Sequence, residues 1–216
     1  ALELGAEGTL GEVEASGLRG RGGAGFPAHI KWRTVADTPA PQKYVVCNAD
    51  EGDSGTFADR LLIETDPLQL IEGMAIAGVT TGATQGYIYL RSEYPAAATV
   101  LTYALARARE HGALGIDVFG SGLHFDIDVR IGAGAYICGE ETSLLESLEG
   151  KRGVIRAKPP LPAISGLFKQ PTLVHNVLTL AATSTVLAAG GAHYEHFGVG
   201  RSRGTMPFQL GGNVLR

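Results

Sequence analysis

The segment from Gly132 to Thr142 constrains the fold of this chain more than any other stretch. Its sequence, GAGAYICGEET, has the glycine spacing of a phosphate-binding loop, but Glu140 and Glu141 stand where such a loop requires Lys and Ser or Thr. Two carboxylates repel a triphosphate, which argues against ATP hydrolysis. Carboxylates do accept hydrogen bonds from ribose hydroxyls, amides or the imide N–H of a flavin. The segment therefore predicts a loop whose backbone approaches a flat ligand, a flavin or a nicotinamide.

Glycine is also abundant in the rest of the chain, where it is clustered. It accounts for 31 of 216 residues, about twice the usual share of roughly 7%. No Gly-X-Y period exists, and the clusters lie at 20–25, 52–55, 132–139 and 211–212. Clustered glycines indicate loops in which the backbone comes close to another group. The formal net charge of -4 provides no broad basic face for a nucleic acid.

The two cysteines, Cys47 and Cys138, limit the redox chemistry of the chain itself. Two cysteines cannot build a disulfide framework, which suggests a reducing compartment. They also cannot hold an iron–sulfur cluster alone, because such clusters usually need four thiolates. No apolar run approaches the roughly 20 residues of a membrane span, and no signal peptide is visible. Because the chain does not begin with Met, we expect it to be part of a longer polypeptide.

Hydrophobic periodicity predicts strands alternating with helices. Strands are predicted at 44–47, 86–90 and 123–131, helices at 67–80, 95–111 (with Gly112 as the C-cap), 142–148 and 174–189, and an extended basic, proline-rich segment at 151–162. This alternation predicts an α/β fold with a largely parallel sheet. Ligands of such sheets bind at the carboxyl ends of the strands, so the turn at 48–53 and the loop at 132–141 are expected to share one site.

A second glycine-rich loop, Gly20–Gly25, satisfies the dinucleotide-binding pattern GxGxxG. That fingerprint also needs a preceding strand and an acid about 20 residues later, and the sequence offers neither. The loop is therefore predicted to bind a cofactor with a different geometry. Phe26 could face a planar ring and Lys31 could meet a phosphate. The alternative is that Phe26 and Trp32 are core residues.

Acids and amides are dense in the turn after the first predicted strand. Asn48, Asp50, Glu51 and Asp53 could form a ligand site, a solvated turn, a glycosidase-like acid pair or a divalent-metal site. No aromatic floor for a sugar lies nearby, and the calcium-loop spacing is absent. The pair His193 and His196 gives only a weak metal signal.

Taken together, these motifs closely resemble the NADH-oxidising FMN flavoprotein subunit shared by respiratory complex I, bidirectional hydrogenases and NAD-dependent formate dehydrogenases. Four blocks carry the resemblance: GLRGRGGAGFP at 17–27, CNADE at 47–51, 132–147, and KPP at 158–160. The resemblance implies a modified Rossmann-like FMN-binding domain. The match extends over nearly the whole chain from about Gly17.

The resemblance also implies which residues contact each cofactor. For FMN these are Gly20, Arg21, Gly22, Lys31, Asn48, Asp50, Tyr136, Gly139, Glu140 and Asn176. For NAD(H), lying over the flavin, they are Phe26, Glu51, Asp53, Glu141 and Lys158. No protein group is expected to act as a catalytic acid or base, because hydride passes between the two cofactors. No resident metal is expected in this segment.

Some positions depart from complex I members. Thr34 and Leu161 stand where aromatic residues often sandwich the adenine, which implies weaker or different stacking. Asp53 replaces the usual Glu, and His175 replaces the first Asn of an Asn-Asn pair. The segments 30–34, 52–55 and 91–95 are more similar to formate dehydrogenase β subunits.

The resemblance implies an electron-transfer subunit that exchanges hydride between NAD(H) and FMN and passes single electrons to or from iron–sulfur clusters. The implied setting is a soluble, cytoplasmic, NAD-dependent formate dehydrogenase. Its expected partners are a thioredoxin-like iron–sulfur γ subunit and a larger catalytic α subunit, without nucleic acid or membrane insertion. Complex I, a hydrogenase diaphorase, or a cofactor-free assembly module are the alternatives. Residues 1–205 would form the FMN- and NAD(H)-binding domain and 206–216 would open a β-rich domain, with a 4Fe-4S cluster in a further domain.

Overall fold

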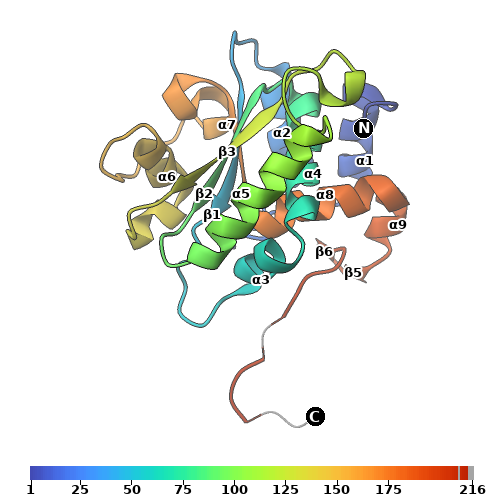
Figure 1. Cartoon of the computed structure of the whole chain (residues 1–216). Helices are drawn as coiled ribbons and strands as arrows, with labels where there is room; N and C mark the ends of the chain where they lie inside the picture. The colour runs from blue at the N-terminus through green and yellow to red at the C-terminus, as the bar shows by residue number, and fades with distance from the viewer. Residues whose placement is uncertain (209, 214–216) are drawn as a thin grey trace.

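A four-stranded parallel sheet forms the centre of the molecule (Figure 1). The computed structural model describes residues 1–208 and 210–213. The strands are β1 (Tyr44–Ala49), β2 (Gln85–Leu90), β3 (Asp126–Ile131) and β4 (Thr172–Asn176), in the order β3-β2-β1-β4. The α/β class and the parallel sheet predicted from the sequence are confirmed.

Helices connect the strands and cover both faces of the sheet. The α-helices are α1 (Gly5–Ala15), α2 (Ala28–Asp37), α3 (Ala58–Thr65), α4 (Pro67–Thr81), α5 (Pro95–Glu110), α6 (Glu141–Leu148), α7 (Pro162–Ser165), α8 (Val177–Ala189) and α9 (Gly191–Glu195). Short 3-10 turns are η1 (Val118–Gly120), η2 (Tyr136–Gly139) and η3 (Leu167–Lys169), and a small hairpin joins β5 (Gly198–Val199) to β6 (Ser202–Arg203). Among the described residues, no helix is long and apolar enough to cross a membrane.

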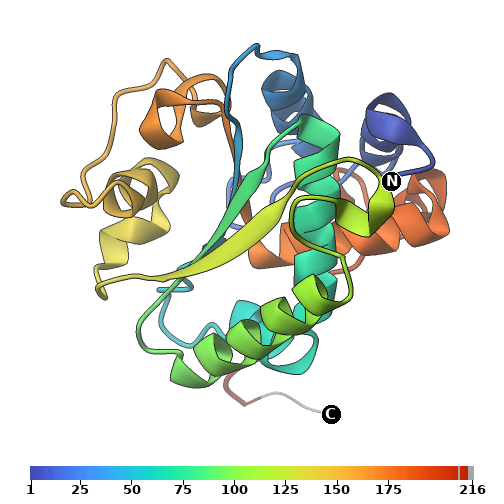
Figure 2. The ribbon, with the colours of Figure 1, turned by 45° about the horizontal axis from the view of Figure 1, so that its top comes forward.

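The two faces of the sheet bury different side chains, because successive residues of a strand point to opposite sides. Val45 and Cys47 of β1 belong to a large core shared with α4, α5 and α8, whereas Val46 belongs to a smaller one shared with α6. Figure 2 shows α6 on one side of the sheet and α4 and α5 on the other. The loops that follow β1 and β3 leave the sheet at its carboxyl edge, between these two layers.

Helices α4 and α8 pack unusually closely on the larger face. A methyl group added to Gly73 of α4 would lie 1.9 Å from the carbonyl oxygen of Leu180 in α8. The absence of a side chain at Gly73 therefore permits backbone contact between the helices. This packing fixes the position of α8, whose first residue, Val177, directly follows the last residue of β4.

Most predicted elements are present, with one clear error. The chain from 174 to 189 was expected to be one helix, but it begins as the end of strand β4 and becomes helical only at Val177. Asn176 separates the two elements because its side-chain oxygen accepts a hydrogen bond from the Leu178 N–H and caps α8. The predicted strand at 123–131 begins later, at Asp126. Gly112 follows α5 with φ +71°, as a C-terminal glycine should.

Three helices near the glycine loop and the acidic turn, α1, α2 and α3, were not predicted. Because helix α1 precedes the glycine loop, the strand that a Rossmann fingerprint requires is indeed missing. Residues 206–208 and 210, where the sequence analysis expected a β-rich domain to open, form no regular element, and Gln209 lies outside the described residues. In Figure 1 residues 206–208 lead away from the α/β body.

Candidate functional site

A cavity of about 450 Å³ opens at the carboxyl ends of β1 and β4. The strand order reverses here, since β2 and β3 extend the sheet to one side of β1 and β4 lies on the other. Such a switch point is the usual ligand site of an open α/β sheet. Asn48 and Asn176, paired in register on β1 and β4, both contribute to its wall. The volume is in the range of small-molecule sites.

The glycine loop forms one wall of the cavity. It is closed by a hydrogen bond from the Gly20 N–H to the Phe26 carbonyl, 2.9 Å, and attached to α8 by one from the Arg21 N–H to Thr179 Oγ1, 2.8 Å. A methyl group on Gly22 would lie 3.3 Å from Cβ of Asn176. The loop therefore packs its backbone directly against the end of β4.

The acidic turn and the loop after β3 meet, as the sequence predicted. Asn48 Nδ2 donates to the Gly139 carbonyl at 2.8 Å, and Asn48 Oδ1 accepts from the Asp50 N–H at 3.1 Å. Burial raises the pKa of Asp50. Its Oδ2 is buried without a hydrogen-bond partner in the described part of the chain. An acceptor without a partner beside Gly139 suits a ligand that brings an N–H or O–H group.

A chain of four alternating charges lines another part of the cavity wall. Lys31 Nζ lies 3.1 Å from Glu141 Oε2, and Lys158 Nζ lies 2.7 Å from Glu141 Oε1 and 3.1 Å from Glu140 Oε1. Glu140 also caps α6 by accepting from the Thr142 and Ser143 N–H groups. Burial alone would raise the pKa of both acids, but these lysines and hydrogen bonds lower it. Both carboxylates are therefore charged at neutral pH.

The structure brings together many of the predicted cofactor residues but not all of them. The cavity wall contains Gly20, Gly22, Phe26, Lys31, Asn48, Gly139, Glu140, Glu141, Lys158 and Asn176. Arg21, Asp50, Glu51, Asp53 and Tyr136 are not part of this wall. Thr34 and Leu161, the two positions expected to affect adenine stacking, both line it.

The predicted residues outside the wall have other contacts. The side chain of Arg21 donates from Nη2 to the Arg203 carbonyl of β6. Glu51 accepts from the Asp59 and Arg60 N–H groups at the start of α3, at 3.1 and 3.2 Å. Tyr136 donates to Asp53 Oδ1 at 2.7 Å, and both side chains are exposed.

The two aromatic residues after the glycine loop have different environments. Trp32 is 1% exposed and belongs to the core, whereas Phe26 is 41% exposed at the cavity. The core alternative was therefore right for Trp32 and not for Phe26. The indole N–H of Trp32 donates to Nε2 of His175 at 3.1 Å. Burial, together with Lys31, lowers the pKa of His175 to about 3, so this cavity residue stays neutral.

Asp59 is a neighbour of the site that the sequence analysis missed. Its Oδ2 accepts a hydrogen bond of 2.7 Å from Nδ2 of Asn176, and the residue is 6% exposed. Burial, followed by the nearby Glu51, raises its pKa to about 7. No local pattern marks it, because its partner is 117 residues away in the sequence.

No group of three or more His, Cys, Asp or Glu residues that could hold a metal ion occurs within 1–208 and 210–213. Both cysteines are buried, and burial raises the pKa of Cys47 well above its ordinary value. Cys47 is consequently a packing residue of β1.

Comparison with known proteins identifies the family of this fold and site. Residues 13–185 match the Complex1_51K family, the Nuo51 FMN-binding domain, and the chain belongs to that family. The predicted family resemblance is thereby confirmed.

Curated relatives are similar over almost the whole chain. An NADH-quinone oxidoreductase subunit of Rhizobium meliloti is 50% identical over 94% of this chain and 48% of its own length. NADP-reducing hydrogenase subunit HndC of Solidesulfovibrio fructosivorans is 50% identical over 94% of this chain and 41% of its own length. The chain thus spans about half the length of these relatives.

A solved structure has the same fold. An NAD+-reducing [NiFe]-hydrogenase in its H2-reduced state superposes with a TM-score of 0.88 and 39% identity, over 94% of this chain and 34% of that one. The modified Rossmann-like class expected from the sequence is consistent with this likeness.

Proposed function

We propose that this chain binds FMN and NAD(H) in the cavity at the β1–β4 switch point and works as the electron-entry segment of a multi-subunit oxidoreductase. The observation that carries the proposal is the convergence of three distant segments, the glycine loop, the end of β1 and the start of α6, on one cavity. Membership of the Nuo51 FMN-binding domain family supports FMN as the cofactor. The NADH- and NADP-linked names of the relatives support a nicotinamide substrate.

The residues present fit a flavin. The glycine loop presents backbone without side chains to the cavity. The partnerless Oδ2 of Asp50 lies outside the cavity wall, beside Gly139, as an acceptor for an N–H donor. Asn48 and Asn176 would hold the flavin edge at the ends of β1 and β4, and Lys31 would meet its phosphate. When bound, FMN supplies the ability to take up a hydride and release electrons singly.

The charged wall would receive the nucleotide. We assign Lys158 and Glu141 to nucleotide contact, with Phe26 as the planar surface, since all three line the cavity. Glu51 and Asp53 lie beyond this wall, so their proposed role is at its rim. With Thr34 and Leu161 as non-aromatic wall residues, adenine would be held by apolar contact instead of an aromatic sandwich.

Purified protein provides the test. We expect a yellow preparation, or one that becomes yellow on FMN addition, with NADH–ferricyanide activity. Gly22→Leu should weaken FMN binding more than tenfold, because its Cβ would already lie tightly against Cβ of Asn176, at 3.3 Å, and the rest of the side chain would take further space at the cavity wall. The matched control is Gly11→Leu on the exposed side of α1. Colourless wild-type protein that refuses FMN would favour a cofactor-free assembly module.

The finer assignment that we propose is the β subunit of a soluble, cytoplasmic, NAD-dependent formate dehydrogenase. It is supported by the similarity of segments 30–34, 52–55 and 91–95 to such subunits. Its partners would be a thioredoxin-like iron–sulfur γ subunit and a larger α subunit. Residues 206–216 would lead into a β-rich domain, and a 4Fe-4S cluster would lie in a further domain.

Mass spectrometry of co-purifying subunits, with formate and hydrogen tested as reductants of NAD+, distinguishes this setting from the alternatives. Reduction of NAD+ by hydrogen but not formate would assign a hydrogenase diaphorase. Co-purification with membrane subunits and quinone reduction would assign complex I.

A further inference from the structure

The segment 151–161 connects α6 to α7 without regular structure and carries part of the cavity wall. Lys158 and Leu161 line the cavity, while neighbours such as Val154 and Ile155 are exposed. An irregular segment has no ladder of backbone hydrogen bonds to fix its path. Its position over the site must therefore come from particular side chains.

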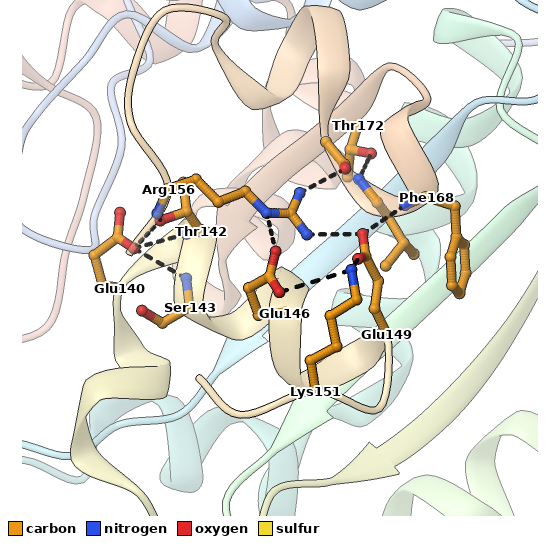
Figure 3. Close-up of polar contacts among 11 residues, drawn as sticks. Glu140, Thr142, Ser143, Glu146, Glu149, Lys151, Arg156, Phe168 and Thr172 are labelled. Carbon is orange, nitrogen blue, oxygen red and sulfur yellow. Dashed lines mark hydrogen bonds and ion pairs between the residues drawn. The ribbon is translucent and has the colours of Figure 1, made fainter. Parts of the chain in front are cut away.

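The guanidinium of Arg156 connects this segment to three other residues. Nε donates to Glu146 Oε1 at 2.5 Å, Nη2 to Glu149 Oε1 at 2.7 Å, and Nη1 to the Gly166 carbonyl at 2.8 Å. Figure 3 shows the side chain extended between the two acids. Glu146 and Glu149 lie on or just after α6, and Gly166 follows α7. One planar group thus ties the segment to both of its flanking helices.

The backbone of Arg156 makes a second connection, directed at the site. Its N–H donates to Thr142 Oγ1 at 3.0 Å, and this hydroxyl in turn donates to Glu140 Oε2. Glu140 Oε1 is the carboxylate oxygen that Lys158 contacts. Arg156 is therefore linked through Thr142 and Glu140 to the lysine two residues further along the segment.

The surrounding charges are balanced. Lys151 lies 2.7 Å from Glu149 Oε2 and 3.8 Å from Glu146 Oε2, so two cations face two carboxylates. The side chain of Glu149 is 7% exposed and also accepts from the Phe168 N–H at 2.8 Å. Replacing Arg156 would leave this carboxylate with a single, largely exposed lysine. Lysine at this position could not reproduce the fork, because it is a point donor on a flexible stem.

We propose that Arg156 is a positioning residue that fixes segment 151–161 so that Lys158 is held between Glu140 and Glu141 for nucleotide binding. The inference rests on the proposed function only in assigning the nucleotide to Lys158. The attachment of the segment by Arg156 is a property of the chain alone.

The test compares Arg156→Gln and Arg156→Lys with Arg152→Gln in the intact protein. Arg152 lies in the same segment, is exposed, and has no ion pair or hydrogen bond among the contacts of the described residues. The readouts are the NAD+ dissociation constant by calorimetry and the hydrogen exchange of 151–161 without nucleotide. For Arg156→Gln we expect about tenfold weaker NAD+ binding and faster exchange of this segment. Arg156→Lys should fall in between, and Arg152→Gln should match wild type.

A double variant shows whether Arg156 acts through Lys158. If it does, Arg156→Gln adds little to the loss of NAD+ affinity already caused by Lys158→Gln. If Arg156→Gln fails to fold, Arg156→Lys takes its place in the cycle. FMN content should be unchanged, because the hydrogen bonds of Arg156 involve neither the glycine loop nor Asn48 or Asn176.

The outcomes separate this inference from the proposed function. Absence of NAD+ binding by wild-type protein would contradict the function, and this inference with it. Wild-type binding with unchanged affinity in both Arg156 variants would overturn the inference alone. Unchanged hydrogen exchange of segment 151–161, or additive losses of NAD+ affinity in the double variant, would also overturn the inference.

Discussion

Two carboxyl groups with little solvent exposure, Asp59 and Glu149, have opposite electrostatic surroundings. Asp59 lies on the side of the sheet covered by α4 and α8, accepts one hydrogen bond from Asn176, and has Glu51 nearby; its pKa rises to about 7. Glu149 lies after α6 between Arg156 and Lys151. Burial alone would raise its pKa, but those two cations and the Phe168 N–H lower it.

At Glu149 two cations and a hydrogen bond together outweigh burial, whereas at Asp59 the hydrogen bond from Asn176 does not. This contrast also corresponds to a difference between the two layers. The larger layer is held by apolar helix packing, whereas the α6 layer combines a small apolar core with a balanced set of charges. The charged wall of the cavity is an extension of the second layer.

The largest expected effect comes from breaking the apolar layer. Gly73→Ala would place a methyl group 1.9 Å from the Leu180 carbonyl, so α4 and α8 must separate. We expect a loss of about 3 kcal/mol in the free energy of unfolding, measured with urea. Gly11→Ala is the control, since nothing lies within 4 Å of the added methyl group on α1. Its helix propensity should stabilise the protein by about 0.5–1 kcal/mol. Equal effects of the two changes would contradict the close packing of α4 and α8.

Asp59→Asn tests the raised pKa of the Asp59 carboxyl group. Because the folded-state pKa is raised to about 7 from 3.8, the folded state retains a proton that the unfolded state loses. This contribution to stability is present at low pH and is lost as pH rises through about 7. Relative to the variant, wild-type protein should lose about 2–4 kcal/mol between pH 4 and pH 8. Parallel stability curves for the two proteins, measured by urea unfolding, would contradict the assignment.

For Glu149→Gln we expect a pH dependence of stability that is opposite in sign to that of Asp59→Asn. A lowered pKa means that the carboxylate stabilises the folded state above its unfolded-state pKa, roughly 4.3, and that this stabilisation is lost as pH falls through the folded value. We expect the variant to be about 1–2 kcal/mol less stable at pH 7. The difference should shrink below pH 4 in the same unfolding series. A difference that grows in acid would rule out the stabilising role of the cations.

The smallest effect concerns the cavity wall. Glu141→Gln removes one negative charge from the cavity wall, while Glu140 still holds Lys158 at 3.1 Å. The wall would then repel an anionic nucleotide less, so NAD+ affinity should increase about threefold. Calorimetry at low and moderate salt checks this, and the gain should diminish with added salt. An unchanged dissociation constant would refute a role for Glu141 in nucleotide affinity.

How much the sequence could predict depends on the range of the interactions involved. The segments 44–47, 67–80 and 86–90 were predicted correctly because their hydrophobic periodicity is local. Residues 174–176 were assigned to the helix that follows them, although the polar His175 and Asn176 precede the apolar run that begins at Val177. Pairing with β1 is what makes these residues part of a strand. The glycine loop was rightly separated from a Rossmann turn because the strand it requires was absent from the sequence.

The sequence by itself determined the α/β class, the two glycine loops and the acids beside them, since composition and spacing carry these features. Only the tertiary structure decided that Phe26 faces the cavity while Trp32 is buried, that Glu51 caps α3, and that Asp59 contacts Asn176. The reason is physical: these contacts join residues from separate elements, and no local periodicity records which elements will meet. The charge state of each enclosed carboxyl likewise depends on neighbours supplied by the fold.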